Sequence, residues 1–213
     1  MYLTATPANK TLNFKIRTSD NETIGAWFIL SDSYYRSLPT VPSDVAVHVT
    51  KALKKRPTIL FFHGNAATRA FNARILHYQA LSSRLAANIL AIDYRGFADS
   101  TGTPSEEGLT RDARAAWDWL VHNGAEQEDI LIVGHSLGTG VSMQLGAELS
   151  FNKIQCRGIV LLSVRPALFQ RDISKPTVDA IAFLKYPSRV EHLPYVWTYT
   201  SDQTTRHYSR CSP

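Results

Sequence analysis

One short stretch of the sequence has the residue types and spacing that nucleophilic catalysis requires. Ser136 lies between Gly134 and Gly138 in the pattern Gly-x-Ser-x-Gly. A mostly apolar run, 129–133, precedes the pattern, and a run compatible with a helix, 141–149, follows it. A buried strand that turns sharply into a helix exposes a serine at the turn, and the residues two before and two after it must be small because the backbone is strained. The stretch therefore predicts a nucleophilic hydroxyl at Ser136.

The neighbours of this serine indicate how its hydroxyl would be used. The start of the helix should direct the N–H of Leu137 toward an oxyanion formed on a carbonyl that Ser136 attacks. We expect Gly140 to let the helix pack close to the sheet, and His135 to line the pocket or hold the turn without taking the proton. The alternative is a glycine-rich turn without catalytic function, because the pentapeptide arises by chance in roughly one chain in fifteen of this length.

Several other functions fit the sequence less well. Residues 134–140 lack the Lys-Ser/Thr pair of a phosphate-binding loop, and their spacing misses the dinucleotide fingerprint. No His/Asp cluster has the spacing of metal ligands, so we discount metal-dependent hydrolysis and expect no metal and no cofactor. The net charge is +5, but the basic residues are scattered except for 51–56 and have no aromatic ladder. We interpret that cluster as a solvated loop and expect no nucleic-acid partner.

Length and composition describe an ordinary globular chain. Its 213 residues suit one domain with a sizeable core. Cys156 and Cys211 give no disulfide framework. The sequence shows no signal peptide and no segment as long as a membrane span, so we expect a soluble chain and assign no compartment.

Hydrophobic periodicity predicts an α/β fold. Segments 12–18 and 24–30 read as an antiparallel hairpin with a turn at 19–22, and a long surface connection with a short helix near 45–53 follows. From residue 58 strands and helices alternate, which predicts a mostly parallel sheet with helices on both faces. The expected strands are 58–62, 88–92, 129–133 and 159–162, and the expected helices are 69–85, 109–123 and one that ends at 150.

Further polar residues follow the predicted parallel strands, at the sheet edge where ligands bind in such folds. His63 and Asp93 lie there with Ser136. Catalysis needs a second oxyanion donor from the loop after the first parallel strand. Because Gly64 permits close backbone approach, we expect the N–H of Asn65 to be that donor; the alternative is a turn in which Asn65 binds its own backbone. His63 precedes the glycine and is expected to be structural.

A second charged group could be mistaken for an active site. Asp93, Arg95 and Asp99 lie close together in the sequence. A buried Asp–Arg pair that fixes a loop is the interpretation we favour for them.

Taken together, these residues resemble the α/β-hydrolase fold and, within it, the subfamily of monoacylglycerol and lysophospholipid (lysophosphatidylserine) lipases. The resemblance implies Ser136 as nucleophile, Asn65 and Leu137 as oxyanion donors, and a carboxylic ester of a lipid as substrate, cleaved through an acyl-enzyme. It also implies a possible membrane surface as partner, because members often carry an N-terminal membrane anchor. The matching runs are 9–11, 25–27, 63–66, 93–97, 102–108, 116–119 and 134–140.

The sequence departs from the subfamily at two loop positions. Ala67 and Ala98 stand where members usually have glycine, so we expect strained loops there. We find no family match after Ser163, and therefore divide the chain into a hydrolase core, 1–163, and an atypical tail, 164–213.

The tail leaves the catalytic triad open, because the order in this fold is Ser, then Asp or Glu, then His. A strand at 195–200 would make Asp202 the acid and His207 the nearest base, but His207 follows too soon to lie on the next strand. We expect the last strands and the last two triad members to be missing, as in a truncated or frame-shifted product. The alternative function is therefore a catalytically dead scaffold or a fragment without the triad Asp and His.

Overall fold

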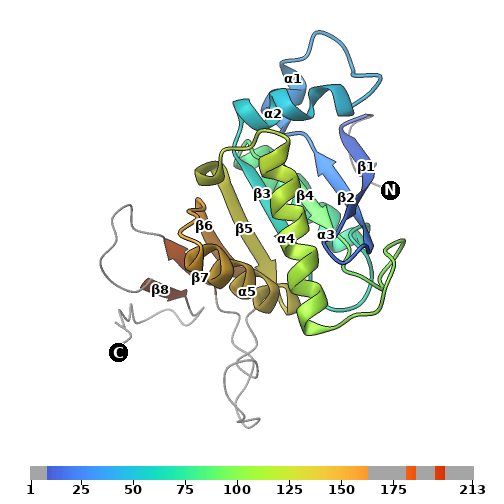
Figure 1. The fold of residues 1–213 in the computed structure, drawn as a ribbon. Helices are drawn as coiled ribbons and strands as arrows, with labels where there is room; N and C mark the ends of the chain where they lie inside the picture. The colour runs from blue at the N-terminus through green and yellow to red at the C-terminus, as the bar shows by residue number, and fades with distance from the viewer. Residues whose placement is uncertain (1–8, 163–180, 186–194, 200–213) are drawn as a thin grey trace.

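A sheet of eight strands runs through the part of the protein that the computed structural model describes, residues 9–162, 181–185 and 195–199. Figure 1 shows the sheet and the helices packed around it. The strand order is β1-β2-β4-β3-β5-β6-β7-β8. The strands are β1 (Thr11–Arg17), β2 (Thr23–Ile29), β3 (Thr58–Phe62), β4 (Asn88–Ile92), β5 (Ile130–His135), β6 (Gly158–Leu162), β7 (Ile181–Lys185) and β8 (Tyr195–Tyr199).

Helices lie against both faces of this sheet, as the alternating pattern predicts. Leu60 and Phe62 of β3 point into the larger cluster with residues of α2, α4 and α5, whereas Ile59 and Phe61 point into a smaller cluster with Tyr78 of α3. The helices are α1 (Asp32–Arg36), α2 (Val49–Lys55), α3 (Asn72–Arg84), α4 (Glu106–His122) and α5 (Leu137–Phe151), with short 3-10 turns η1 (Ala46–His48) and η2 (Gln127–Asp129).

The central strands β3 and β4 have the bounds that the sequence predicts. Every residue of both strands is buried, which explains their continuous apolar character, because a strand covered on both faces has no solvent side. The parallel register pairs Leu60 with Leu90 on one side and with Ile132 on the other. The loops after β3, β4 and β5 therefore leave the same edge of the sheet.

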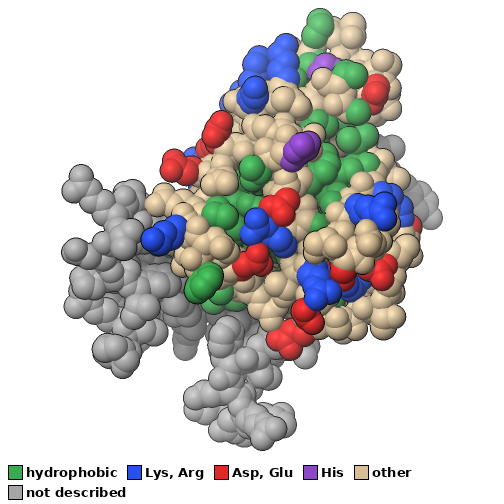
Figure 2. All heavy atoms as spheres, in the orientation of Figure 1, with side chains coloured by type: hydrophobic (Ala, Val, Ile, Leu, Met, Phe, Trp, Pro, Cys, Tyr) green, Lys and Arg blue, Asp and Glu red, His purple; other side chains and the backbone are tan. Residues whose placement is uncertain are grey.

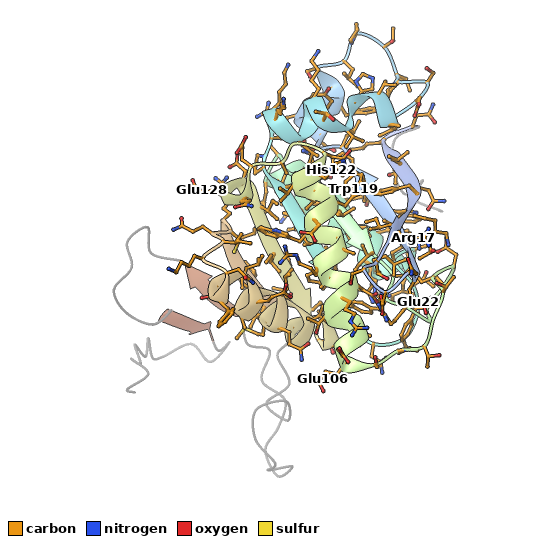
Figure 3. All side chains as sticks on the ribbon, viewed as in Figure 1. Arg17, Glu22, Glu106, Trp119, His122 and Glu128 are labelled. Carbon is orange, nitrogen blue, oxygen red and sulfur yellow. The ribbon has the colours of Figure 1, made fainter. Side chains whose placement is uncertain are left out.

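The N-terminal hairpin is also confirmed. β1 and β2 pair antiparallel, and the Thr18 N–H donates to the Glu22 carbonyl across the turn (2.9 Å). β2 then pairs antiparallel with β4, which joins the hairpin to the parallel strands. Trp119 of α4, labelled in Figure 3, packs against Phe14 of β1 and Phe28 of β2. Its ring centroid lies 4.5 Å from that of Phe14 and 5.8 Å from that of Phe28.

The connection between β2 and β3 is more ordered than the sequence predicts. The short helix expected near 45–53 corresponds to η1 and α2, but α1 was not predicted; the Ser31 hydroxyl accepts from the Tyr34 N–H at its start (3.2 Å). The basic cluster 51–56 was interpreted as a loop, which is wrong. Four of those residues, Lys51, Lys54, Lys55 and Arg56, are exposed on or next to α2, opposite its buried residues.

Beyond β6 the sheet continues with two strands that run antiparallel, β7 beside β6 and β8 beside β7. β8 coincides with the strand predicted at 195–200, and β7 was not predicted. Asp202 and His207, the residues considered as acid and base of the triad, lie outside the described residues. Among the helices that the structure describes, none combines the length and the hydropathy needed to cross a membrane.

Strained backbone occurs at both alanines that replace the glycine of the resembling family. Ala67 has φ 54° and Ala98 has φ 49°, so both are left-handed, as the departure from glycine predicts. A Cβ in this conformation costs roughly 1–2 kcal/mol because it crowds the following carbonyl oxygen. The exposed loop around Ala98 therefore lowers the stability of the fold.

We expect Ala98→Gly to raise the free energy of unfolding by about 0.5–1 kcal/mol, because glycine adopts this φ without the Cβ clash. Urea denaturation followed by circular dichroism measures the change. The control is Ala80→Gly in the middle of α3, where the same substitution should lower the free energy by about 0.5–1 kcal/mol. Effects of the same sign at both positions would contradict the assignment of strain to Ala98.

Candidate active site

The sharp turn predicted at Ser136 is present between β5 and α5. Ser136 has φ 52° and ψ −115°, a combination that side-chain-bearing residues rarely adopt. The Ser136 N–H donates to the Leu162 carbonyl at the end of β6 (3.0 Å), and the Ser136 carbonyl accepts from the N–H of Thr139 (2.9 Å). The serine is half-buried, neither sealed in the core nor fully exposed. Hydrogen bonds on both sides thus hold the strained residue.

Close backbone contacts explain two of the glycines around Ser136. A Cβ on Gly138 would lie 2.1 Å from the Phe62 carbonyl oxygen of β3, and one on Gly134 would lie 2.3 Å from the Gly138 carbonyl oxygen. The role predicted for Gly140 is wrong, because a Cβ there would meet nothing within 4 Å. The helix instead approaches the sheet at Gly146, where a Cβ would lie 2.3 Å from Cδ1 of Ile159.

The loop after β3 lies beside the serine. A Cβ on Gly64 would be 3.2 Å from the Cβ of Ser136 and 3.1 Å from Nδ1 of His135, closer than such contacts usually are, so glycine eases this approach. Asn65, the next residue, is exposed. The structure therefore brings the loop of Asn65 to the turn that carries Ser136 and Leu137; their assignment as oxyanion donors stays a prediction.

His63 has contacts that fit the structural role predicted for it. It is buried, with Nε2 2.9 Å from Oδ1 of Asp93 and Nδ1 2.8 Å from the Gly64 carbonyl oxygen. The Tyr94 hydroxyl donates to the His63 carbonyl (2.8 Å). The ring thereby links the loop after β3 to the loop after β4.

Buried Asp–Arg pairs do fix the loop after β4, with partners that come from elsewhere in the chain. The Arg69 N–H donates to Asp93 (2.6 Å), and the Arg69 guanidinium binds Asp93 and Asp99. Arg95 pairs with Asp112 of α4, Nε to Oδ1 (3.0 Å), and with Asp20 of the hairpin turn (2.7 Å). Arg95 is thus not the partner of Asp93.

The arginine network also affects the acidity of Asp99. Hydrogen bonds from Arg69 and then from Lys15 hold the pKa of the Asp99 carboxyl below its ordinary value, against the opposing effect of partial burial. Desolvation lowers the pKa of the Arg74 guanidinium, which is buried on α3. The edge of the sheet that carries Ser136 therefore contains several charged side chains, which the fold brings together from distant segments.

Two arginines near the site, Arg69 and Arg74, were not singled out from the sequence. The signal for Arg74 is its place on a buried stripe of α3 with Tyr78 and Ser82, four residues apart. A charged residue on the buried face of a helix needs polar partners, and these are loop carbonyls. Arg69 has no comparable periodicity, because it lies in the loop before the helix.

On the face of the molecule that carries α4 and α5, acidic and basic side chains are interspersed (Figure 2). Arg114 of α4 binds both Asp118 and Glu148, for example. This face therefore presents no field of a single sign.

Comparison with known sequences identifies similar proteins. The sequence profile of the family described as alpha/beta hydrolase fold matches residues 57–192. The chain is 37% identical to the lysophosphatidylserine lipase ABHD12 of Rattus norvegicus over 64% of this chain and 33% of that protein. It is 34% identical to the protein of the same name from Gallus gallus, over 73% of this chain and 40% of that protein. The chain thus spans about one third of the length of the first curated relatives it matches.

Solved structures resemble the fold at lower sequence identity. An alpha-beta hydrolase from Vibrio vulnificus has a TM-score of 0.56 at 22% identity, covering 78% of this chain and 51% of that one. A putative hydrolase from Agrobacterium vitis S4 has a TM-score of 0.54 at 19% identity, covering 89% and 68%. This likeness concerns the fold alone.

The turn makes opposite predictions for two glycines of α5. We expect Gly138→Ala to lower the free energy of unfolding by about 3 kcal/mol, because its Cβ would displace the end of β3. Gly140→Ala, its matched control, should raise that free energy by about 0.5–1 kcal/mol, since alanine favours a helix and the space is open. Urea denaturation of both variants measures the difference, and equal effects would contradict the contacts described here.

The Asp99 ion pairs predict a dependence of stability on pH. Because the pKa of Asp99 is lower in the folded state, its contribution is present above the unfolded value, about 3.9, and is lost as the pH falls below it. We therefore expect the gap in free energy of unfolding between wild type and Asp99→Asn to shrink between about pH 5 and pH 3. Urea titrations across this range measure the gap; a constant difference would refute a lowered pKa.

Proposed function

Because this chain belongs to the α/β-hydrolase fold family, we propose that it is a serine hydrolase that cleaves carboxylic esters of lipids through an acyl-enzyme on Ser136. The substrate class is a monoacylglycerol or a lysophospholipid. The observation that carries the proposal is the half-buried serine at a strained turn, with the Gly64 backbone so close that a Cβ there would be 3.2 Å from the serine Cβ. A strained, accessible serine at the end of a central parallel strand is the arrangement that nucleophilic hydrolases of this fold use.

The proposed reaction has two stages. In the first, the Ser136 oxygen bonds to the ester carbonyl carbon while a general base takes its proton, and the N–H groups of Leu137 and Asn65 bind the oxyanion. The intermediate collapses, the alcohol leaves with that proton, and the acyl group stays on Ser136. Water then attacks the acyl-enzyme by the same steps and releases the fatty acid.

The base and its carboxylate partner would follow the nucleophile in the chain, in the order of this fold. Asp202 as acid and His207 as base are the candidates that the sequence offers, and they lie outside the described residues. The names of the relatives support a lysophospholipid as substrate. Since such lipids reside in membranes or micelles, the proposed reaction would take place at a lipid surface.

Labelling with a fluorophosphonate probe tests the proposal, because the probe phosphonylates only an activated serine. We expect labelling of the wild-type chain at Ser136, located by mass spectrometry, and none of Ser136→Ala. Hydrolysis of lysophosphatidylserine and of a monoacylglycerol would then separate the two substrate types. A chain that melts cooperatively but is not labelled would instead be a catalytically inactive hydrolase-like scaffold.

A further inference from the structure

We propose that Arg74 of α3 is a positioning residue that aims the N–H of Asn65 at the oxyanion. This inference rests on the proposed function, because it names the residue that holds the proposed oxyanion donor in place. Arg74 does not itself contact the reacting atoms in this mechanism.

The guanidinium of Arg74 donates hydrogen bonds to several carbonyls of the loop after β3. Nη2 of Arg74 donates to the carbonyl oxygens of Gly64 (2.9 Å) and Ala66 (2.7 Å), with a longer contact to that of Asn65 (3.4 Å). Nη1 donates to the carbonyl of Thr68 (2.6 Å). The planar fork of an arginine presents these donors in a fixed geometry. The carbonyls of Gly64, Asn65 and Ala66 are therefore all turned toward α3.

Because the peptide unit is planar, hydrogen bonds that fix the direction of a carbonyl also fix the direction of the N–H group in the same unit. The C=O of Gly64 and the N–H of Asn65 belong to one planar peptide unit, and in a trans unit they point in opposite directions. No peptide bond among the described residues is cis. Since Arg74 and Nδ1 of His63 (2.8 Å) both contact the Gly64 oxygen, the Asn65 N–H must point away from them. Hydrogen bonds to the carbonyl also polarise the unit and strengthen its N–H as a donor.

The same contacts explain how an unfavourable backbone persists in this loop. Ala66 and Ala67 are consecutive left-handed residues, with φ 59° and 54°. Each costs roughly 1–2 kcal/mol without glycine, so interactions on either side must compensate. Arg74 binds the carbonyls of Ala66 and Thr68, which flank Ala67. Without this grip the loop would relax toward ordinary φ values and the Asn65 peptide would turn.

The positive charge of Arg74 is a second feature that supports the inference. The residue is 8% exposed, and among the ion pairs of the described residues none includes it. Burying a cation without a carboxylate costs free energy, whereas an apolar residue would fill the same stripe of α3 without that cost. Asp93 acts on the Arg74 charge only from a distance, and the positive guanidinium behind the loop would favour negative charge on an oxyanion held by the Asn65 N–H.

The first experiment compares fluorophosphonate labelling rates of Ser136 in three variants. Arg74→Met keeps the apolar stem but removes every donor, and we expect labelling about 10²-fold slower, the effect of losing one oxyanion donor. Arg74→Lys restores one charged nitrogen that cannot reach all the carbonyls, so its rate should be intermediate. The matched control is Arg84→Met on the exposed end of the same helix, which should label at the wild-type rate.

The second experiment needs no activity and separates failure of this inference from failure of the proposed function. ¹⁵N relaxation should give order parameters of about 0.85 for Asn65 and Ala66 in the wild type, and below about 0.6 in Arg74→Met. If the wild type is not labelled, the proposed function fails and relaxation alone decides the role of Arg74. If Arg74→Met does not fold, Arg74→Lys carries both measurements. A rigid loop together with unchanged labelling in the folded variants would overturn the inference.

Discussion

The close approach of the start of α5 to the end of β3 is the constraint on which the site depends. At Gly138 the helix backbone lies so near the Phe62 carbonyl that no side chain fits between them. That contact forces the chain to reverse within one residue, and the strain falls on Ser136, whose backbone hydrogen bonds reach β6 and the first turn of α5. Because strands β3, β5 and β6 are parallel and in fixed register, their ends can share this small space.

Buried polar side chains fix the loops at this edge of the sheet. Arg69 and Arg74 come from the loop and helix after β3, and each binds groups that apolar packing could not orient: a carboxylate pair in one case and a row of carbonyls in the other. Buried ion pairs contribute little net stability, but breaking one partner away is costly, so they fix geometry more than they stabilise. The loops at this edge are consequently defined by hydrogen bonds rather than by a hydrophobic core.

The sequence predicts those features that depend on local pattern. The bounds of β3 and β4, the hairpin and the turn at Ser136 follow from runs of apolar residues and from glycine spacing, which neighbouring residues determine. The role predicted for Gly140 is wrong because spacing does not reveal which side of α5 faces the sheet at that point, and α1 is too short to show a period. The arginine partners of Asp93 and of the Gly64 carbonyl, and the carboxylate partners of Arg95, could not be predicted. Each lies ten or more positions away in the chain, and only the tertiary fold brings it close.

The N-terminal hairpin supplies polar partners to the loops beside Ser136, so removing it would affect more than the edge of the sheet. Its turn supplies Asp20 to Arg95, and its first strand supplies Asn13 to Arg69 and Lys15 to Asp99. A fragment that started after the hairpin would retain the central strands yet leave two largely buried guanidinium groups short of their counterparts, at the very edge where the serine sits. Because Asn13 and Lys15 lie on the exposed face of β1, that face is constrained as well as the core face. Removing the two strands would therefore dismantle the network of charges beside Ser136.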